Sequence, residues 1–172
     1  MTGAAARAEC SSDQVQEGFR EAMRRVAQTV TIISSRNGSG RVGMTATSVA
    51  SVSMDPPSLL VSVKRTASIH RPLEAVGAFC VNVLNTDQQE HCFDFSGRKE
   101  GEARFEPGEW TEEYGLPCLA DAQANIFCTV DAMLGYATHT IFVGRVTRVL
   151  TRGVVAPLVY LNGGFIPGPA VQ

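Results

Sequence analysis

The sequence lacks long hydrophobic runs, clusters of basic residues and any regular cysteine spacing. No apolar stretch in its 172 residues approaches the roughly 18 residues that a membrane-spanning helix needs. The 15 Lys and Arg residues are scattered and are balanced by 17 Asp and Glu, so the charge pattern does not predict a nucleic-acid-binding surface. The opening residues MTGAAARAECSSD have no hydrophobic core behind Arg7 and are not typical of a secretory signal. We therefore expect a cytoplasmic protein whose partners include neither a membrane nor a nucleic acid.

The cysteines do not form the pattern of a disulfide framework or of a zinc ribbon. They are five in number and lack short paired spacings: Cys10, Cys80, Cys92, Cys118 and Cys128. The adjacent pair His91-Cys92 would point in different directions on a helix, and no second pair is present to complete a tetrahedral site. We expect reduced thiols that fill space, and no bound metal.

Charged residues are also scarce, at 19% of the chain against 44% hydrophobic residues. This balance argues against disorder and favours a subunit that buries surface against a second copy. The length fits one domain with a single core. We expect a flexible arm at residues 1–12, one domain at residues 13–166 and a C-terminal tail at residues 167–172.

Hydrophobic periodicity predicts an amphipathic helix near the start of the chain. Asp13 and Gln16 have the spacing of a capping box. Apolar residues then recur at helical spacing: Val15, Phe19, Ala22, Met23 and Val26. We expect this helix to cover one side of the fold.

Beyond Gln28 the hydrophobic period changes to two, which is typical of strands. Strands are predicted at residues 28–36, 43–54, 58–64, 79–84, 122–131, 138–150 and 158–161, with short helices at 71–76 and from Thr86. Strands outnumber helices and are joined mostly by turns. The sequence therefore predicts a mainly β protein whose antiparallel sheet closes into a barrel with a few flanking helices.

The segment from Gly38 to Gly43 matches the dinucleotide fingerprint G-x-G-x-x-G in letters only. That fingerprint binds a pyrophosphate where its third glycine opens a helix, whereas here a strand follows. We interpret Asn37-Gly38 and Gly40 as a hairpin turn.

Hydroxyl side chains line one face of the predicted strand 43–54, at Thr45, Thr47, Ser51 and Ser53. Taken alone, this face is also explained by strand propensity on a solvated side. A second strand ends at Ser62-Val63-Lys64-Arg65 and continues through Thr66 to Ser68. Hydroxyls, main-chain amides and cations together suit a phosphate and a polar heteroaromatic ring.

An ordered series of motifs resembles the flavin reductase family. The motifs are GMTATSVASVSMDPPSLLVSV (43–63), the loop 64–68, FSG (95–97), Arg104-Phe105, Trp110, GLPCL (115–119), Cys128, HTIFVGRV (139–146) and PLVY (157–160). The resemblance extends from Phe19 to Phe165. It implies an FMN-binding, antiparallel Greek-key split β-barrel, usually a homodimer, which agrees with the barrel predicted from periodicity.

The resemblance also implies roles for individual residues. Thr45, Ala46, Thr47 and Ser48 would lie along the isoalloxazine ring and ribityl chain. Ser62, Val63 and Lys64 would contact the flavin from the next strand, and Ser68 would lie at its phosphate. The remaining implied flavin-side residues are Phe95, Ser96 and Arg98. His139 would lie beside the flavin and the nicotinamide as the catalytic residue.

The chain departs from the family pattern at two places. Ala137-Thr138 stand where the family commonly has Gly-Asp before the histidine, so the carboxylate that would orient His139 is missing. The junction Ala27-Gln28-Thr29 lacks the usual Pro or Gly at one wall of the pocket. Other side chains have simpler interpretations: His91 as solvated helix surface, and Phe105 and Trp110 as packing for the acidic segment 98–113. For His70 a structural role is favoured over the alternative, a loop contact near the phosphate.

The function that the resemblance implies is reduction of FMN or FAD by NADH or NADPH. A hydride passes from nicotinamide C4 to flavin N5, and the reduced flavin leaves for a separate monooxygenase. No arginine pair for a 2′-phosphate is evident, which favours NADH. Three alternatives stay open: a non-catalytic FMN carrier or store, an enzyme like pyridoxamine-phosphate oxidase, and a structural adaptor barrel without flavin.

Overall fold

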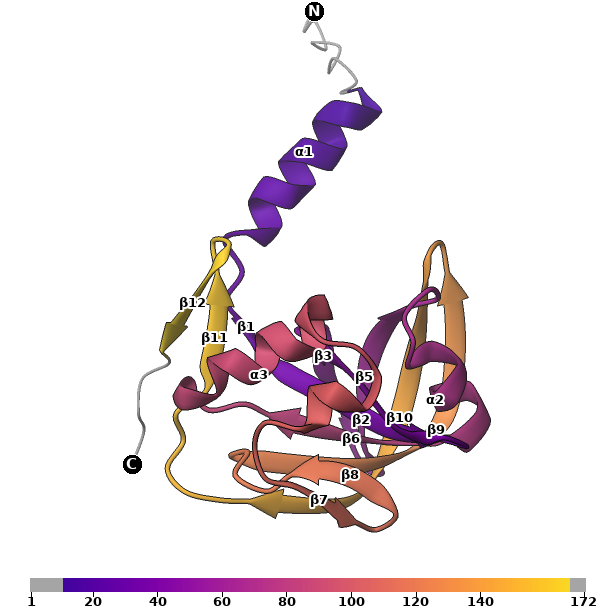
Figure 1. Cartoon of the computed structure of the whole chain (residues 1–172). Coiled ribbons are helices and arrows are strands. Elements are labelled where there is room, and N and C mark those ends of the chain that lie inside the picture. Colours follow the sequence, from indigo (N-terminus) through magenta and orange to yellow (C-terminus); the bar gives the residue numbers. More distant parts are fainter. Residues whose placement is uncertain (1–10, 168–172) are drawn as a thin grey trace, which may run out of the picture.

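The computed structural model describes residues 11–167 as a mainly antiparallel β protein (Figure 1). A seven-stranded sheet has the order β3-β2-β6-β9-β10-β5-β4, and all its neighbouring strands pair antiparallel. Its strands are β2 (Thr31–Asn37), β3 (Gly40–Ala46), β4 (Val49–Met54), β5 (Pro57–Lys64), β6 (Ala78–Val83), β9 (Ala124–Tyr136) and β10 (His139–Thr151). The predicted mainly β, antiparallel class is confirmed.

Smaller elements surround this sheet. The strands are β1 (Gln28–Thr29), β11 (Leu158–Leu161) and β12 (Gly164–Pro167) in one sheet, and β7 (Trp110–Glu113) and β8 (Leu116–Leu119) in a hairpin. The helices are α1 (Ser12–Met23), α2 (His70–Val76) and α3 (Gln89–Phe93), with short helical turns at Thr86–Gln88, Asp94–Arg98 and Gly101–Phe105. Within residues 11–167, no helix is long and apolar enough to cross a membrane.

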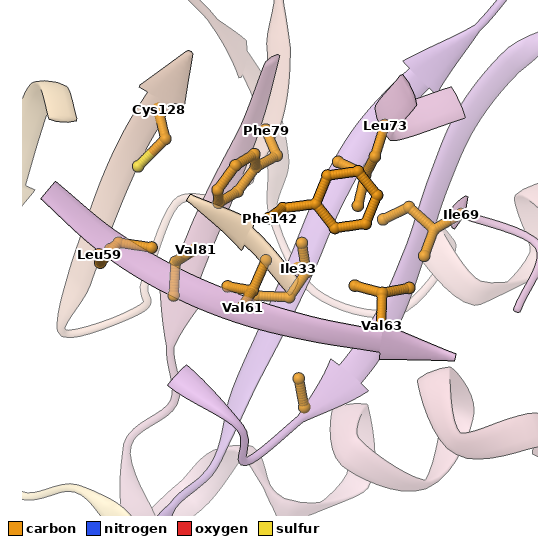
Figure 2. Packing of buried hydrophobic residues seen from close by; sticks show 11 residues of the cluster. Ile33, Leu59, Val61, Val63, Ile69, Leu73, Phe79, Val81, Cys128 and Phe142 are labelled. Carbon is orange, nitrogen blue, oxygen red and sulfur yellow. The ribbon is translucent and has the colours of Figure 1, made fainter. Parts of the chain in front are cut away.

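The core lies inside the main sheet and is closed at one end by the segment that leads into α2. Figure 2 shows the rings of Phe79 and Phe142 at the centre of this core, with Ile69 and Leu73 beside them. All four side chains are completely buried. Burial of one such side chain stabilises a fold by about 1.5–3 kcal/mol, so this cluster holds the strands that carry the site.

Strand boundaries differ from the predictions where the alternation of apolar and polar residues continues across the end of a strand. The predicted strand 43–54 is two strands, β3 and β4, separated at Thr47 and Ser48. The segment Gly38-Ser39 is the turn of the β2–β3 hairpin, in which Asn37 pairs with Gly40, so the interpretation of the glycine motif is confirmed. Strand β12 and the β7–β8 hairpin were not predicted. These strands are only four residues long, too short to show a period.

The N-terminal helix begins earlier than predicted, and only its last turns border the rest of the single chain, at Tyr160 and Gly163. Its cap is Ser11, whose side chain accepts from the N–H of Gln14 while the Gln14 side chain bonds back to Ser11. The helix extends away from the sheets (Figure 1), and none of its residues is buried. Ser11 and Ser12, which were expected in the flexible arm, therefore belong to this helix and its cap. Residues 1–10 and 168–172 lie outside the described part of the chain.

The segment between β6 and β9 packs on the outside of β3. Its centre is an aromatic cluster in which the ring of Phe95 lies 4.9 Å from that of Phe105 and 5.2 Å from that of Trp110. The packing role predicted for Phe105 and Trp110 is confirmed. The cluster reaches β3 at Gly43, where an added Cβ would lie 2.6 Å from Phe95 Cε1. Only glycine at this position admits so close an aromatic ring.

Candidate functional site

A cavity of about 440 Å³ opens beside the end of β3. We call it the hydroxyl cavity. Its lining comprises Val30, Thr45, Ala46, Thr47, Cys92, Phe93, Ser96, Tyr160, Gly163 and Phe165. Four of the predicted site residues, Thr45, Ala46, Thr47 and Ser96, therefore share one cavity. Its volume lies within the range of about 300–1,000 Å³ that is typical of small-molecule sites.

The hydroxyls of this cavity have different roles because each carries a single hydrogen. Thr45 Oγ1 and Ser96 Oγ both donate to the carbonyl of Cys92, over 2.8 and 2.7 Å. These two groups can only accept hydrogen bonds from a ligand. Within residues 11–167, the Thr47 hydroxyl has no such partner, so it is the available donor.

Thr47 also borders a second cavity, of about 510 Å³, at the junction that departs from the family pattern. Ala27, Gln28 and Thr29 line it together with Thr47. The junction therefore forms a wall beside the predicted flavin residues even without the usual Pro or Gly.

Ser48 and Ser62 extend the pairing of β4 with β5 into the β3–β4 connection. The Ser62 N–H donates to the Ser48 carbonyl over 3.2 Å, and the Ser48 hydroxyl donates to the Ser62 carbonyl over 3.0 Å. Val63 is completely buried in the core. Its side chain therefore faces away from any cofactor, and only its main chain remains for a contact.

His139 lies directly opposite Lys64 at the ends of β10 and β5. Both side chains are exposed. The His139 ring is oriented by its neighbour, since Nδ1 lies 2.8 Å from Thr138 Oγ1. The Thr138 hydroxyl thus orients the His139 ring in place of the carboxylate that the family commonly has at this position.

Ser68 lies at another cavity, of about 410 Å³, which we call the Ser68 cavity. Arg104 lines it too, and its Nη1 donates to the carbonyl of Gly43 over 2.9 Å and lies 3.4 Å from Ser68 Oγ. Within residues 11–167 this guanidinium has no carboxylate partner. Sequence reasoning gave Arg104 no role in the site, although the Arg104-Phe105 motif was a signal.

Two predicted site residues lie elsewhere. Phe95 is 3% exposed and packs in the aromatic cluster behind β3. Arg98 is held by carboxylates, with Nε 2.7 Å from Asp94 and Nη1 2.7 Å from Glu90, and hydrogen bonds to these groups raise the pKa of Arg98. Neither side chain lines a cavity described above. Phe95 supports the wall from behind, and Arg98 anchors the segment after α3.

Of the other histidines, His70 has the structural role that the sequence favoured, and His91 differs from its predicted setting. His70 is buried, and its Nε2 lies 2.8 Å from Thr140 Oγ1, so it joins α2 to β10 instead of facing a phosphate. His91 is half-buried, its Nδ1 has no partner among the described residues, and burial lowers its pKa. It is packed against Gly108 and is not solvated surface.

The described cysteines are buried free thiols, as predicted, while Cys10 lies outside the described residues. Burial raises the pKa of Cys128 to about 12 and that of Cys80 well above its ordinary value. These groups are protonated and unreactive at neutral pH. Within residues 11–167, no group of three or more His, Cys, Asp and Glu side chains is placed to hold a metal ion.

The antiparallel sheet, with hydroxyls at the end of β3 and the Lys64–His139 pair at the ends of β5 and β10, has the architecture of a split-barrel protein. The family model of the flavin reductase like domain matches residues 23–168, and the chain belongs to this family.

Relatives and solved structures carry related names. The chain is 41% identical to the "FADH(2)-dependent resorcinol hydroxylase, reductase component" of a Rhizobium species, over 88% of this chain and 86% of that protein. It is 36% identical to the "FMN reductase (NADH) RutF" of Stutzerimonas stutzeri, over 90% of each chain. The flavin reductase of styrene monooxygenase from Pseudomonas putida superposes with a TM-score of 0.81 at 30% identity, covering 90% of this chain and 99% of that one.

Proposed function

We propose that this protein is an NADH-dependent flavin reductase that supplies reduced FMN or FAD to a separate oxygenase. The observation that carries the proposal is the set of polar groups at two cavities along β3 and at the ends of β5 and β10. Thr45, Thr47 and Ser96 line the hydroxyl cavity, Ser68 and Arg104 line the Ser68 cavity, and His139 pairs with Lys64. The names of the relatives, which include an NADH-dependent FMN reductase and the reductase component of a hydroxylase, support the same activity.

The residues present fit a flavin. The hydroxyl cavity has apolar walls for a ring system, at Val30, Phe93 and Phe165, and hydroxyls for its polar edge. The chemistry that bound flavin supplies is acceptance of a hydride from the nicotinamide, which needs positioning more than acid or base groups. Thr47 donates a hydrogen bond to the ring or the ribityl chain, whereas Thr45 and Ser96 accept.

The phosphate end of the flavin lies at Ser68 in this proposal. The Ser68 hydroxyl donates to a phosphate oxygen, and Arg104 and Lys64 balance its charge. His139, held by Thr138, would hydrogen-bond the carboxamide of the nicotinamide. Its role would be to orient the nicotinamide for hydride transfer to the flavin.

The working form in this proposal is a homodimer. Helix α1 has 12 residues and none is buried, and isolated helices of about that length are only marginally stable in water. Its apolar side chains Val15 and Phe19 are 59% and 64% exposed. A second exposed apolar area, at Leu134 and Tyr136, adjoins His139, since Tyr136 pairs with His139 across the hairpin. A second copy covers these surfaces and shields the side of the site nearest His139.

One assay separates the reductase from its alternatives. The purified protein is mixed with NADH and catalytic FMN or FAD, and NADH oxidation is followed by absorbance. Turnover with added flavin is the expected result. Flavin binding without NADH oxidation would identify a carrier or store, and the absence of flavin binding would leave only an adaptor barrel. A cytoplasmic location stays a prediction from the sequence.

A further inference from the structure

The Ser68 cavity provides room beyond the proposed position of the flavin phosphate. It borders β3 at residues 40–43, while the hydroxyl cavity borders the same strand at Thr45 and Ala46. Gly43 and Thr45 are two positions apart, which is about 7 Å along a strand. Both cavities therefore lie along β3, and Ser68 and Arg104 line the second one. A phosphate at Ser68 would occupy only part of the volume of about 410 Å³.

The far wall of the Ser68 cavity carries a planar cation held in a fixed orientation. The Arg41 guanidinium lies 4.7 Å from the centre of the Phe105 ring, and its Nε and Nη2 each lie 2.8 Å from Glu102 Oε2. The Arg41 N–H also donates to Glu102, and this bond is the main cause of the lowered pKa of that carboxyl. Because guanidinium groups stack on flat ring systems, Arg41 provides a platform for a nucleobase.

The remaining polar groups of the cavity suit a sugar and a second phosphate. Arg104 is the unpaired cation at its entrance within residues 11–167. Glu100 lines the cavity and has no ion-pair partner in the same described range. A carboxylate is an acceptor for ribose hydroxyls, as in many nucleotide sites. The cavity therefore brings together a cation, an acceptor and a planar platform.

We propose that the Ser68 cavity binds the adenylate half of a dinucleotide, and that FAD is consequently the preferred flavin. The proposal rests on the proposed flavin reductase function. Both FAD and NADH contain an adenylate, but Ser68, the proposed phosphate residue, itself lines the cavity, which favours FAD. Arg104 lies between the two phosphates, Glu100 accepts from the ribose, and adenine stacks on Arg41.

The test places a large side chain at the border of the Ser68 cavity, so that the side chain occupies part of its volume. Ser39 lines the cavity in the exposed β2–β3 turn, whereas the preceding Gly38 does not line it, and a Cβ added at Gly38 would have no atom within 4 Å. Ser39→Trp is expected to raise the KM for FAD by about fivefold or more and that for FMN by less than about twofold. The matched control Gly38→Trp leaves both values unchanged. A second variant, Glu100→Ala, raises only the KM for FAD.

The outcomes distinguish the two sources of adenylate. If Ser39→Trp raises the KM for NADH when FMN is the flavin, the adenylate belongs to the nicotinamide nucleotide and the subsite stands. Equal effects on FAD and FMN, or no effect on FAD and NADH, would overturn the proposal. Titration with ADP alone provides a readout without turnover: wild type binds it and Ser39→Trp does not. Loss of NADH oxidation with every flavin would instead refute the reductase function.

Discussion

The hydroxyl of Thr45 donates a 2.8 Å hydrogen bond to the carbonyl oxygen of Cys92, and so ties strand β3 to helix α3 at the wall of the hydroxyl cavity. The contact joins positions 47 residues apart in the chain. It fixes the cavity width on the side where the ring system is proposed to lie.

Replacing Thr45 by Val keeps the shape of the side chain and removes this bond. We expect the free energy of unfolding to fall by about 1 kcal/mol and the KM for flavin to rise as the wall loosens. Urea unfolding and steady-state kinetics measure the two effects. The same change at exposed Thr151, which makes no side-chain hydrogen bond within residues 11–167, should alter neither. Unchanged stability of the Thr45 variant would mean that the bond does not hold the wall.

Ser68→Ala removes the hydroxyl proposed to donate to the flavin phosphate. A lost hydrogen bond to a charged group should raise the KM for FMN by roughly tenfold. Riboflavin, which has no phosphate, should be reduced equally well by the variant and the wild type. A parallel loss with riboflavin would place the effect on the ring system and contradict the phosphate role.

His139→Ala should act mainly on the nicotinamide nucleotide. We expect a several-fold higher KM for NADH with little change in kcat, because the ring positions the carboxamide and transfers no proton. Thr138→Val, which frees the ring without removing it, should give a smaller effect in the same direction. A KM for NADH in His139→Ala equal to that of the wild type would contradict the role of His139 in positioning the nicotinamide.

The proposed dimer depends on the apolar face of α1. Phe19→Asp places a charge on that face and should shift the molar mass measured by light scattering from two chains towards one. Glu17, on the opposite face and bonded to Arg20, offers the control Glu17→Gln, which should remain dimeric. A wild-type protein that is monomeric at micromolar concentration would refute the assembly.

His91 should make stability depend on pH. Its pKa is lowered from 6.5 because burial outweighs the nearby carboxylates of Asp121, Asp94 and Glu90. The unfolded chain therefore binds a proton more readily than the folded one, and stability rises with pH. The contribution is complete above 6.5 and is lost as the pH falls towards the folded-state pKa.

The measurement is the urea midpoint between about pH 8 and about pH 5. We expect the midpoint of the wild type to fall across this window and that of His91→Gln to fall less. Identical slopes for the two proteins would show that the ring protonates without cost despite its unpartnered Nδ1.

Much of the site could be predicted because strand periodicity and the hydroxyl pattern act locally. The strand pattern predicts a shared face for Thr45 and Thr47, and both line one cavity; Ser96, which the family resemblance alone implied, joins them there from a distant segment. The break at Thr47–Ser48 was not predictable, since residues on both sides continue the same alternation. Only the folded structure shows that the hydroxyls of Thr45 and Ser96 already donate their hydrogens to the Cys92 carbonyl.

The basic residues show a further limit of sequence reasoning. Arg98 and Arg104 lie in one aperiodic segment, so the sequence pattern does not show which of them is paired with a carboxylate. In the folded chain Asp94 and Glu90 engage Arg98, whereas Arg104 reaches Ser68. The N-terminal cap is similar: Ser11 and Asp13 are both good caps, and only local geometry selects Ser11.

The segment between β6 and β9 meets β3 at Arg41, Gly43 and Thr45, where it lines the ligand groove. Its other end is part of the scaffold, since Leu119 packs with Ile32 and donates its N–H to buried Asn82. Diversity in the accepted nucleotide can therefore evolve through residues 100–104 at the groove, while the part near Leu119 is retained for the stability of the sheet.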